Sequence, residues 1–190
     1  PKAMDRFSAI ETLAGRRLLV TGSTGFLGKV FLALLLDRQP RLGRRFVLVR
    51  GRRGESAESR FFATALASPV FEPLRELHGE GFESFLRERI TVLEGDVALP
   101  CCGLSAESLA ALANLDAVVH NAGLVALNPP LDESLSVNAR GVLNIATLAA
   151  GLGARLLHVS TAYVTWRGSG RVAEEGPARG PEGVDPLREL

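Results

Sequence analysis

The sequence has little cysteine and no long hydrophobic run. Its only cysteines, Cys101 and Cys102, are adjacent, and adjacent Cα atoms lie about 3.8 Å apart, closer than the roughly 4.4 Å lower end for ordinary disulfides. A disulfide framework and a cysteine metal site are therefore excluded, which indicates a reducing compartment, and we expect a cytoplasmic location. The longest apolar run, residues 30–36, is far shorter than the about 20 residues that span a membrane. No transmembrane segment is therefore expected.

An excess of charge of either sign is also lacking. The 22 basic and 21 acidic side chains give a formal net charge of +1, which excludes a strong general attraction to nucleic acid and leaves room only for a local basic patch. The three histidines form no close cluster of ligands, so no metal site is expected. The basic residues are twenty arginines and two lysines, Lys2 and Lys29, and Tyr163 is the single tyrosine. Catalysis by lysine or tyrosine thus has few candidate residues.

Five short apolar runs alternate with helical stretches along the chain. Each run is too short for a typical helix and predicts a strand buried on both faces. This alternation favours βαβ units. The predicted fold class is α/β: a Rossmann-like, doubly wound parallel sheet of strand order 3-2-1-4-5 with helices on both faces. The predicted strands are 17–21, 46–49, 90–93, 117–120 and 156–159, with helices expected over about 25–37, 105–113 and 131–151.

A glycine-rich turn follows the first predicted strand and opens the first long helix. Gly22 permits a sharp turn, Gly25 lets the backbone approach a pyrophosphate, and Gly28 lets the helix pack closely on the sheet. N–H groups at the helix start then face the phosphates. The alternative is a turn without a ligand, but the strand–turn–helix context favours a phosphate loop. The candidate cofactor-binding residues of this loop are Thr21, Gly22, Ser23, Thr24, Gly25, Phe26, Leu27 and Gly28.

The residue after the second predicted strand indicates which nucleotide binds. NAD sites usually have an acidic residue at the end of this strand, where it holds the ribose 2′-hydroxyl. Arg50 occupies this place, 22 positions after Gly28, and Arg52 and Arg53 follow it. A guanidinium here would pair with a 2′-phosphate through charge-assisted hydrogen bonds of about 1.5–3 kcal/mol. Arg50 therefore predicts NADP(H) as the cofactor, against the alternative of a solvated arginine cluster.

Two segments depart from the simple alternation. Residues 51–89 separate the second and third strands by far more than one helix needs, and we expect helical patches around 58–66 and 82–89. Residues 167–190 contain five glycines and three prolines, which predicts irregular structure. The expected organisation is one NADP-binding, Rossmann-like domain over residues 1–166, with its insertion at 51–89, followed by an irregular tail at 167–190.

Several runs of the sequence resemble those of extended short-chain dehydrogenase/reductases. The more specific ones are Gly-Phe-Leu-Gly-Lys at 25–29, Ser-Pro-Val-Phe-Glu-Pro-Leu at 68–74 and Ser-Thr-Ala-Tyr-Val at 160–164. Over about residues 15–166 the chain resembles one branch, the fatty acyl-CoA reductases and the related thioester-reductase domains. This resemblance implies a Rossmann-like fold, NADPH as cofactor, and reduction of an acyl thioester to an aldehyde or alcohol.

The resemblance also assigns roles around the cofactor. Asp96 with Val97 would lie beside the adenine, with the Asp96 carboxylate accepting from its amino group. The alternative for Asp96 is a cap at a turn or strand end. The other cofactor-binding candidates are Asn121, Ala122 and Gly123, at the sheet edge where ligands bind, and Asn138, which would brace the fourth strand.

The catalytic residues that the resemblance implies are incomplete. Thr161, preceded by Ser160, matches the hydroxyl that holds the substrate carbonyl; the alternative is a pair of capping residues. The family's Tyr-x-x-x-Lys proton donor is absent, because Arg167 stands four residues after Tyr163 and no lysine follows Lys29. Arginine does not replace lysine stereochemically. We therefore expect either the cofactor-binding part of a longer enzyme or a module that binds the dinucleotide without turnover, and we favour the first.

The predicted function is NADPH-dependent reduction of a fatty acyl-CoA or carrier-protein-bound acyl thioester. By itself the 190-residue chain is expected to be inactive, because the proton donor is missing. Two alternatives stay open: a nucleotide-sugar epimerase or dehydratase of the same superfamily, and a non-catalytic NADP-binding module. The sequence leaves the acyl chain length, the product and the oligomeric state undetermined.

Overall fold

The structure, a computed structural model, describes residues 8–161. The chain divides into two units, Pro1–Val159 and Ser160–Leu190, and the elements described below all belong to the first unit. The predicted tail at 167–190, together with Tyr163 and Arg167, lies outside the described residues.

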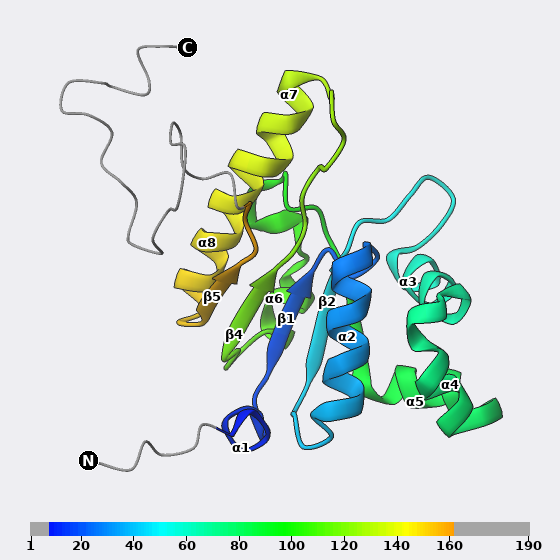
Figure 1. Cartoon of the computed structure of the whole chain (residues 1–190). Coiled ribbons are helices and arrows are strands. Elements are labelled where there is room, and N and C mark those ends of the chain that lie inside the picture. The colour runs from blue at the N-terminus through cyan, green and yellow to red at the C-terminus, as the bar shows by residue number, and fades with distance from the viewer. Residues whose placement is uncertain (1–7, 162–190) are drawn as a thin grey trace, which may run out of the picture. The chain divides into compact units, whose positions relative to one another are not determined.

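The first unit is built on a parallel sheet of five strands in the order β3-β2-β1-β4-β5 (Figure 1). Both the strand order and the parallel arrangement confirm the prediction. Each strand begins within one residue of its predicted start, because the apolar runs that define the strands are short and clearly bounded. The strands are β1 (Leu18–Thr21), β2 (Arg45–Val49), β3 (Ile90–Glu94), β4 (Ala117–His120) and β5 (Arg155–His158).

Helices lie on both faces of this sheet (Figure 1), as the fold class predicts. Among the described residues, no helix is long and apolar enough to cross a membrane. The α-helices are α1 (Ala9–Leu13), α2 (Phe26–Arg38), α3 (Ala57–Ala67), α4 (Glu72–His78), α5 (Phe82–Arg89), α6 (Ala106–Ala111), α7 (Leu131–Ser134) and α8 (Gly141–Gly151). Shorter 3₁₀ segments are η1 (Pro69–Phe71), η2 (Gly79–Gly81) and η3 (Pro100–Gly103), and η4 (Leu135–Arg140) is a π-helical turn.

The alternation of side chains along the central strands divides the core into two layers. Val20 and Val47 pack with α2, α3 and α5 on one face of the sheet. Their neighbours Leu19 and Phe46 pack with α8 on the other face. Because both faces are covered, these strands are mostly apolar, which is why the sequence shows them as nearly continuous runs.

The long β2–β3 connection is a packed helical layer. Ser56 caps α3 by accepting a hydrogen bond from the Ser59 N–H at 3.1 Å. Phe61, Phe71 and Leu86 are all buried in the core layer that contains Val20. The helical patches predicted at 58–66 and 82–89 are α3 and α5, and α4 lies between them.

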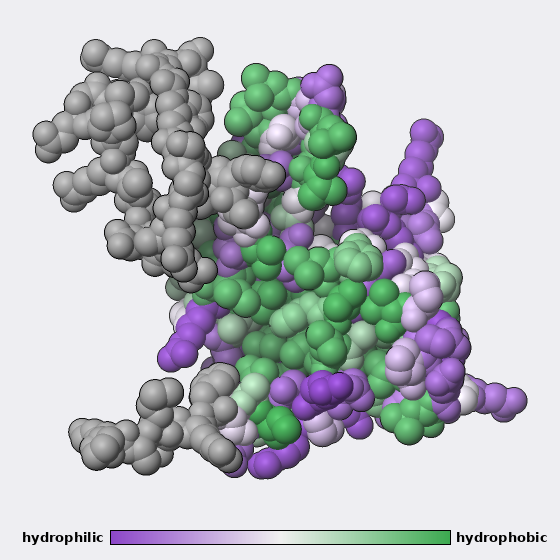
Figure 2. All heavy atoms as spheres, in the orientation of Figure 1, coloured by the Kyte–Doolittle hydropathy of each residue, from purple (hydrophilic) through white to green (hydrophobic). Residues whose placement is uncertain are grey.

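β5 differs from its prediction as a strand buried on both faces. All four of its residues are exposed in the described part of the chain, and Leu157 keeps 57% of its surface accessible. Among the described strands β5 pairs with β4 alone, but position at the edge is not a sufficient reason, because the other edge strand, β3, has buried residues. The two strands differ in the helices that cover them: β3 packs with α3 and α5, whereas β5 packs with α8. Figure 2 shows hydrophobic surface over the region where β1, β4 and β5 lie in Figure 1. The apolar run was sufficient to predict a strand, but it did not predict whether helices cover the two faces of that strand.

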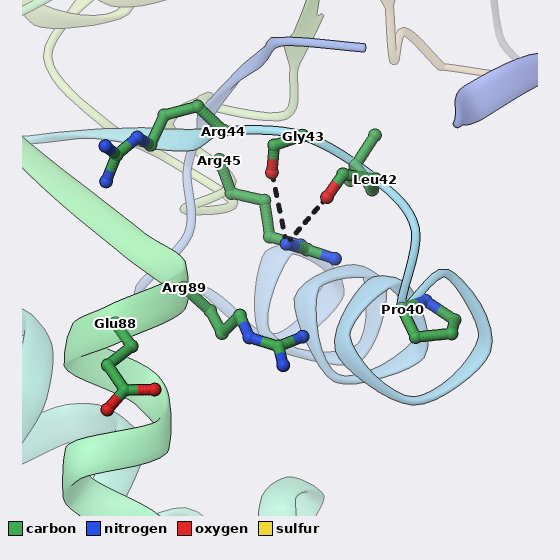
Figure 3. A pocket seen from close by; sticks show the side chains of 7 residues that line it. All are labelled: Pro40, Leu42, Gly43, Arg44, Arg45, Glu88 and Arg89. Atoms are coloured by element: carbon green, nitrogen blue, oxygen red, sulfur yellow. Dashed lines mark hydrogen bonds between the residues drawn. The ribbon is translucent and has the colours of Figure 1, made fainter. Parts of the chain in front are cut away.

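At the opposite edge of the sheet from the glycine loop, a buried arginine secures the connection between α2 and β2 (Figure 3). The Arg45 guanidinium donates to the carbonyls of Gln39, at 2.7 Å, and of Leu42 and Gly43. Burial, and then the nearby charge of Arg89, lowers the pKa of Arg45 to about 10. Since the Gln39 carbonyl belongs to the end of α2, Arg45 also compensates the negative end of the helix dipole.

Candidate nucleotide-binding groove

The turn between β1 and α2 has the geometry of a phosphate loop. Gly22 has φ +69°, and a Cβ there would lie 2.6 Å from the Asn121 carbonyl carbon. Gly25 is the N-cap of α2 and has no side chain that could accept a hydrogen bond from the first N–H groups of the helix. These N–H groups are therefore available to a ligand. A Cβ on Gly28 would lie 2.2 Å from the Gly22 carbonyl oxygen. Gly22 and Gly28 therefore have a steric reason to be glycine.

A groove runs along the carboxyl edge of the sheet beside this loop. It brings together most of the residues predicted to bind the cofactor, from four different strand ends. In a doubly wound sheet this edge is where ligands bind, on both sides of the point at which the strand order reverses. The predicted residues that line the groove are Thr21, Gly22, Thr24, Gly25, Arg50, Asp96, Val97, Asn121, Ala122 and Gly123.

The other predicted loop residues lie outside the groove lining. Ser23 is buried, with a hydroxyl that has no hydrogen-bond partner among the described residues. Phe26 and Leu27 are exposed in the first turn of α2, so their side chains do not form a wall and only their backbone N–H groups can serve a phosphate. Gly28 acts through close packing of the helix on the loop.

Arginines gather at the end of the groove beside β2. Arg50 Nη1 lies 3.6 Å from Asp96 Oδ2, while Asp96 Oδ1 accepts from the Ala98 N–H at 2.9 Å. One oxygen of Asp96 therefore caps the turn that follows β3, which was the alternative role predicted for this residue. Arg60 lines the same groove and donates to the Arg50 carbonyl. Burial and then the charges of Arg52 and Arg50 lower the pKa of Arg60, which indicates a concentration of positive charge.

Arg60 could not be identified as a site residue from the sequence. It lies on α3, ten residues after Arg50, and only the packing of α3 beside β2 and β3 brings it to the groove. Several apolar and backbone contributors were missed for the same reason, since the tertiary fold decides which side chains face a cavity. The unpredicted lining residues are Leu48, Val49, Arg60, Gly95, Leu124, Glu133 and Val137.

A buried histidine supports the turn after β4. Thr21 Oγ1 lies 2.6 Å from His120 Nδ1 and accepts from the Ala122 N–H at 3.1 Å. Which of the two groups donates depends on the imidazole tautomer, because the Thr21 oxygen has two lone pairs and can accept from both Ala122 and His120. His120 is completely buried and stacks on His158, with ring centroids 5.1 Å apart. The Thr21–His120 hydrogen bond holds the end of β4 against the end of β1.

Helix residues support the groove from the other side. Asn138 lies in the π-helical turn and forms two hydrogen bonds with Leu124: its Oδ1 accepts from the Leu124 N–H at 2.8 Å, and its Nδ2 donates to the Leu124 carbonyl at 3.0 Å. These two hydrogen bonds tie Asn138 to the segment after β4, and its role at the cofactor stays a prediction. Asn144, which the sequence did not single out, donates to the Val97 carbonyl at 2.8 Å.

Ser160 and Thr161 fall at the start of the second unit. Their sequence-based role as the substrate hydroxyl therefore stays a prediction. Tyr163 and Arg167 lie outside the described residues.

The groove fits a dinucleotide. A glycine cradle at Gly22, too tight for any side chain, faces the first turn of a 13-residue helix. Asn121 lines the groove, and its Nδ2 group is buried and has no partner among the described residues. Arg50 and Arg60 add positive charge where a nucleotide carries phosphate. Glycine loop, orphaned amide and neighbouring arginines together define a dinucleotide-binding Rossmann domain.

Comparison with known proteins gives the particular family. Residues 20–184 match the NAD-binding family described as "Male sterility protein", and the chain belongs to this family. This match, together with the relatives below, confirms the resemblance to fatty acyl-CoA reductases and thioester-reductase domains. It also confirms that the chain is a domain of a family that binds a nicotinamide dinucleotide.

Individual relatives agree with this assignment. Probable fatty acyl-CoA reductase 4 of Arabidopsis thaliana is 34% identical over 88% of this chain and 35% of its own length. The chloroplastic fatty acyl-CoA reductase 2 of the same plant is 31% identical over 87% and 27%. The crystal structure of the terminal R domain from the myxalamid PKS-NRPS biosynthetic pathway aligns at a TM-score of 0.63, with 29% identity over 80% and 36%. The chain spans about a third of the length of these proteins.

Proposed function

We propose that this chain is the NADP(H)-binding part of an acyl-thioester reductase. The observation that carries the proposal is the pair Arg50 and Arg60, which lines the groove beside the glycine loop of a member of this family. A bound NADPH would supply a hydride for a thioester carbonyl. The Gly22–Gly25 turn and the start of α2 would hold its pyrophosphate.

The arginine pair favours NADP(H) over NAD(H). Arg50 stands where NAD sites have an acidic residue, and Arg60 is anchored on the Arg50 carbonyl. A 2′-phosphate placed between them would neutralise two neighbouring cations and would draw Arg50 from Asp96, its 3.6 Å partner. Asp96 would then be released to accept from the adenine amino group.

The nicotinamide half would lie against the segment after β4. Asn121, Ala122 and Gly123 line the groove there, and their position is fixed by the Thr21–His120 pair. Thr161, with Ser160 before it, is proposed as the hydroxyl that holds the substrate carbonyl during hydride attack, because such attack builds negative charge on that oxygen.

The substrate class follows from the relatives. The Arabidopsis proteins are named for fatty acyl-CoA, whereas the myxalamid R domain ends a PKS-NRPS pathway. We propose an acyl thioester as the shared substrate, with coenzyme A as the carrier, since these plant relatives, named for acyl-CoA, are more alike in sequence to the chain than the R domain is.

The cofactor preference is tested by titration of wild-type and variant chains with NADPH and NADH. Arg50→Ala is expected to weaken NADPH about 10- to 150-fold, through loss of a charge-assisted contact of about 1.5–3 kcal/mol, and to leave NADH nearly unchanged. Arg60→Ala is expected to act in the same direction.

Arg38→Ala serves as the matched control, because Arg38 is exposed on α2 and its ion pair is with Asp37. It removes the same charge from the protein and is expected to leave both affinities within about twofold. Equal losses for NADPH and NADH in Arg50→Ala, or tighter binding of NADH than NADPH by wild type, would contradict recognition of the 2′-phosphate.

The reaction itself is tested by following NADPH oxidation with a long-chain acyl-CoA. The protein expressed from its complete reading frame is expected to oxidise NADPH in an acyl-CoA-dependent manner. The 190-residue chain is expected to bind NADPH without turnover, because it contains no Tyr-x-x-x-Lys and general acid catalysis typically contributes about 10²–10⁴-fold. NADPH binding without oxidation by the complete protein would instead identify a non-catalytic module.

A further inference from the structure

One continuous helical segment contacts both halves of the groove. It begins with α7, passes through the π-helical turn η4 and ends with α8 (Figure 1). Asn138 pairs with Leu124 on the nicotinamide side, and six residues later Asn144 donates to the Val97 carbonyl on the adenine side. Both contacted residues, Leu124 and Val97, line the groove.

The contact to Val97 fixes a segment that follows a strand end. After β3 the chain turns through residues 95–98, and Val97 is buried against α8. A Cβ on Gly141 would lie 3.1 Å from Val97 Cγ2, so the helix packs closely on Val97 at this glycine, and a larger residue would require Val97 to shift slightly. The Asn144 amide then provides the hydrogen bond that fixes the Val97 backbone. Side-chain packing and the carbonyl contact thus act on the same residue.

The adjacent residue carries the adenine-facing chemistry. Asp96 lines the groove next to Val97, and its carboxylate is shared between Arg50 and the Ala98 N–H. A rotation of the Val97 peptide would move Asp96 and, through it, Arg50. The helix carrying Asn144 therefore sets the geometry of the adenine wall without touching the groove through Asn144 itself, which is not among its lining residues.

We propose that Asn144 is a positioning residue for the adenine half of the cofactor, acting through the Val97 carbonyl; Asn138, whose bracing role the resemblance implies, is the comparison on the Leu124 side. The inference rests on the proposed NADP(H)-binding function. The two asparagines of one helical segment would thus support different halves of the dinucleotide site, so each half can be weakened by a separate substitution.

The test uses two ligands that share the adenine half. NADPH contains both halves, and adenosine 2′,5′-bisphosphate contains only the adenine, its ribose and their phosphates. Asn144→Leu keeps the approximate side-chain size and removes the donor. It is expected to raise the Kd of both ligands by the same factor, about 3- to 10-fold, through loss of one positioning hydrogen bond. Asn138→Leu is expected to raise the Kd of NADPH alone.

Thr147→Val is the control, since Thr147 is exposed on α8 and does not line the groove. It is expected to leave both Kd values within about twofold. Asn144→Ala is measured alongside Asn144→Leu, and the urea midpoint of every variant is recorded, so that binding is compared only among folded chains. A general loss of structure would change both ligands in both asparagine variants and would erase the contrast between them.

Three outcomes decide the inference. Parallel losses in the Asn144 variants with an NADPH-only loss in Asn138→Leu support it. An unchanged Kd for adenosine 2′,5′-bisphosphate in folded Asn144→Leu and Asn144→Ala overturns it, while wild-type binding leaves the proposed function intact. Failure of the wild type to bind either ligand overturns the cofactor proposal, and the positioning role with it.

Discussion

Replacement of Gly22 with alanine is expected to raise the Kd for NADPH at least about 100-fold and to lower the free energy of unfolding by about 2–4 kcal/mol. Two physical terms add at this position. Gly22 has φ +69°, a conformation that costs an L-residue about 1–2 kcal/mol. The new Cβ would also lie 2.6 Å from the Asn121 carbonyl carbon and 2.7 Å from the Ala122 nitrogen.

The second term acts directly on the groove. Atoms of a backbone cannot rotate away from a new methyl group as a flexible side chain can, so the segment after β4 must separate from the turn after β1. That movement pulls Ala122 from the Thr21 hydroxyl, to which its N–H donates at 3.1 Å. The glycine turn and the groove wall after β4 would therefore both be displaced by a single methyl group.

Gly151→Ala is the matched control for this substitution. Gly151 is the last residue of α8, and a Cβ there would meet nothing within 4 Å. This variant is expected to leave NADPH binding unchanged and to stabilise the chain slightly, by up to about 1 kcal/mol. Titration with NADPH and urea unfolding measure both quantities. A Gly22→Ala chain with wild-type affinity and stability would show that the turn relaxes freely.

Local patterns in the sequence were enough to predict part of the fold and part of the site. Short apolar runs predicted the five strands, because a strand buried on both faces is continuously apolar, and the doubly wound arrangement predicted their order. The roles of the glycines and of Arg50 could be predicted because these residues directly follow β1 and β2 in the sequence. Once the strands are parallel, all their carboxyl ends must share one edge.

Other features depend on tertiary placement and left no local signal. Arg60 reaches the groove only through the packing of α3, and Asn144 is one polar residue in an apolar helix until its partner, the Val97 carbonyl, is known. The burial of Leu157 on β5 was wrongly predicted, because an apolar run does not show how much of a strand the helices cover. The hydrogen bond between His120 and Thr21 could not be predicted from the sequence, because 99 positions separate the two residues.

The buried His120 makes stability depend on pH in a window where few other groups titrate. Burial, and then the charge of His158, lowers the pKa of His120 from 6.5 to about 4. Its Nε2 has no hydrogen-bond partner among the described residues, and its Nδ1 forms a hydrogen bond with the Thr21 hydroxyl. A second proton on the ring would therefore place a buried charge against another histidine, His158, rather than against an acidic group.

The sign of the pH dependence follows from this lowered pKa. In the unfolded chain His120 takes up a proton as the pH falls through about 6.5, whereas in the folded chain it remains neutral until about pH 4. The unfolded state thus binds more protons between these values, and the free energy of unfolding decreases as the pH falls. Between pH 7.5 and 5 the expected loss is about 2 kcal/mol, with a limiting slope of about 1.4 kcal/mol per pH unit.

Urea unfolding at half-unit intervals between about pH 7.5 and 5 measures this loss above the range in which most carboxylates titrate. In His120→Gln the slope assigned to His120 is expected to disappear, whatever the absolute stability of the variant. His78→Gln is the matched control, because it removes a histidine that stacks on Phe85 away from this pair, and is expected to retain the slope. A wild-type stability that is flat over this range, or a slope that persists in His120→Gln, would contradict a neutral His120 that becomes protonated only on unfolding.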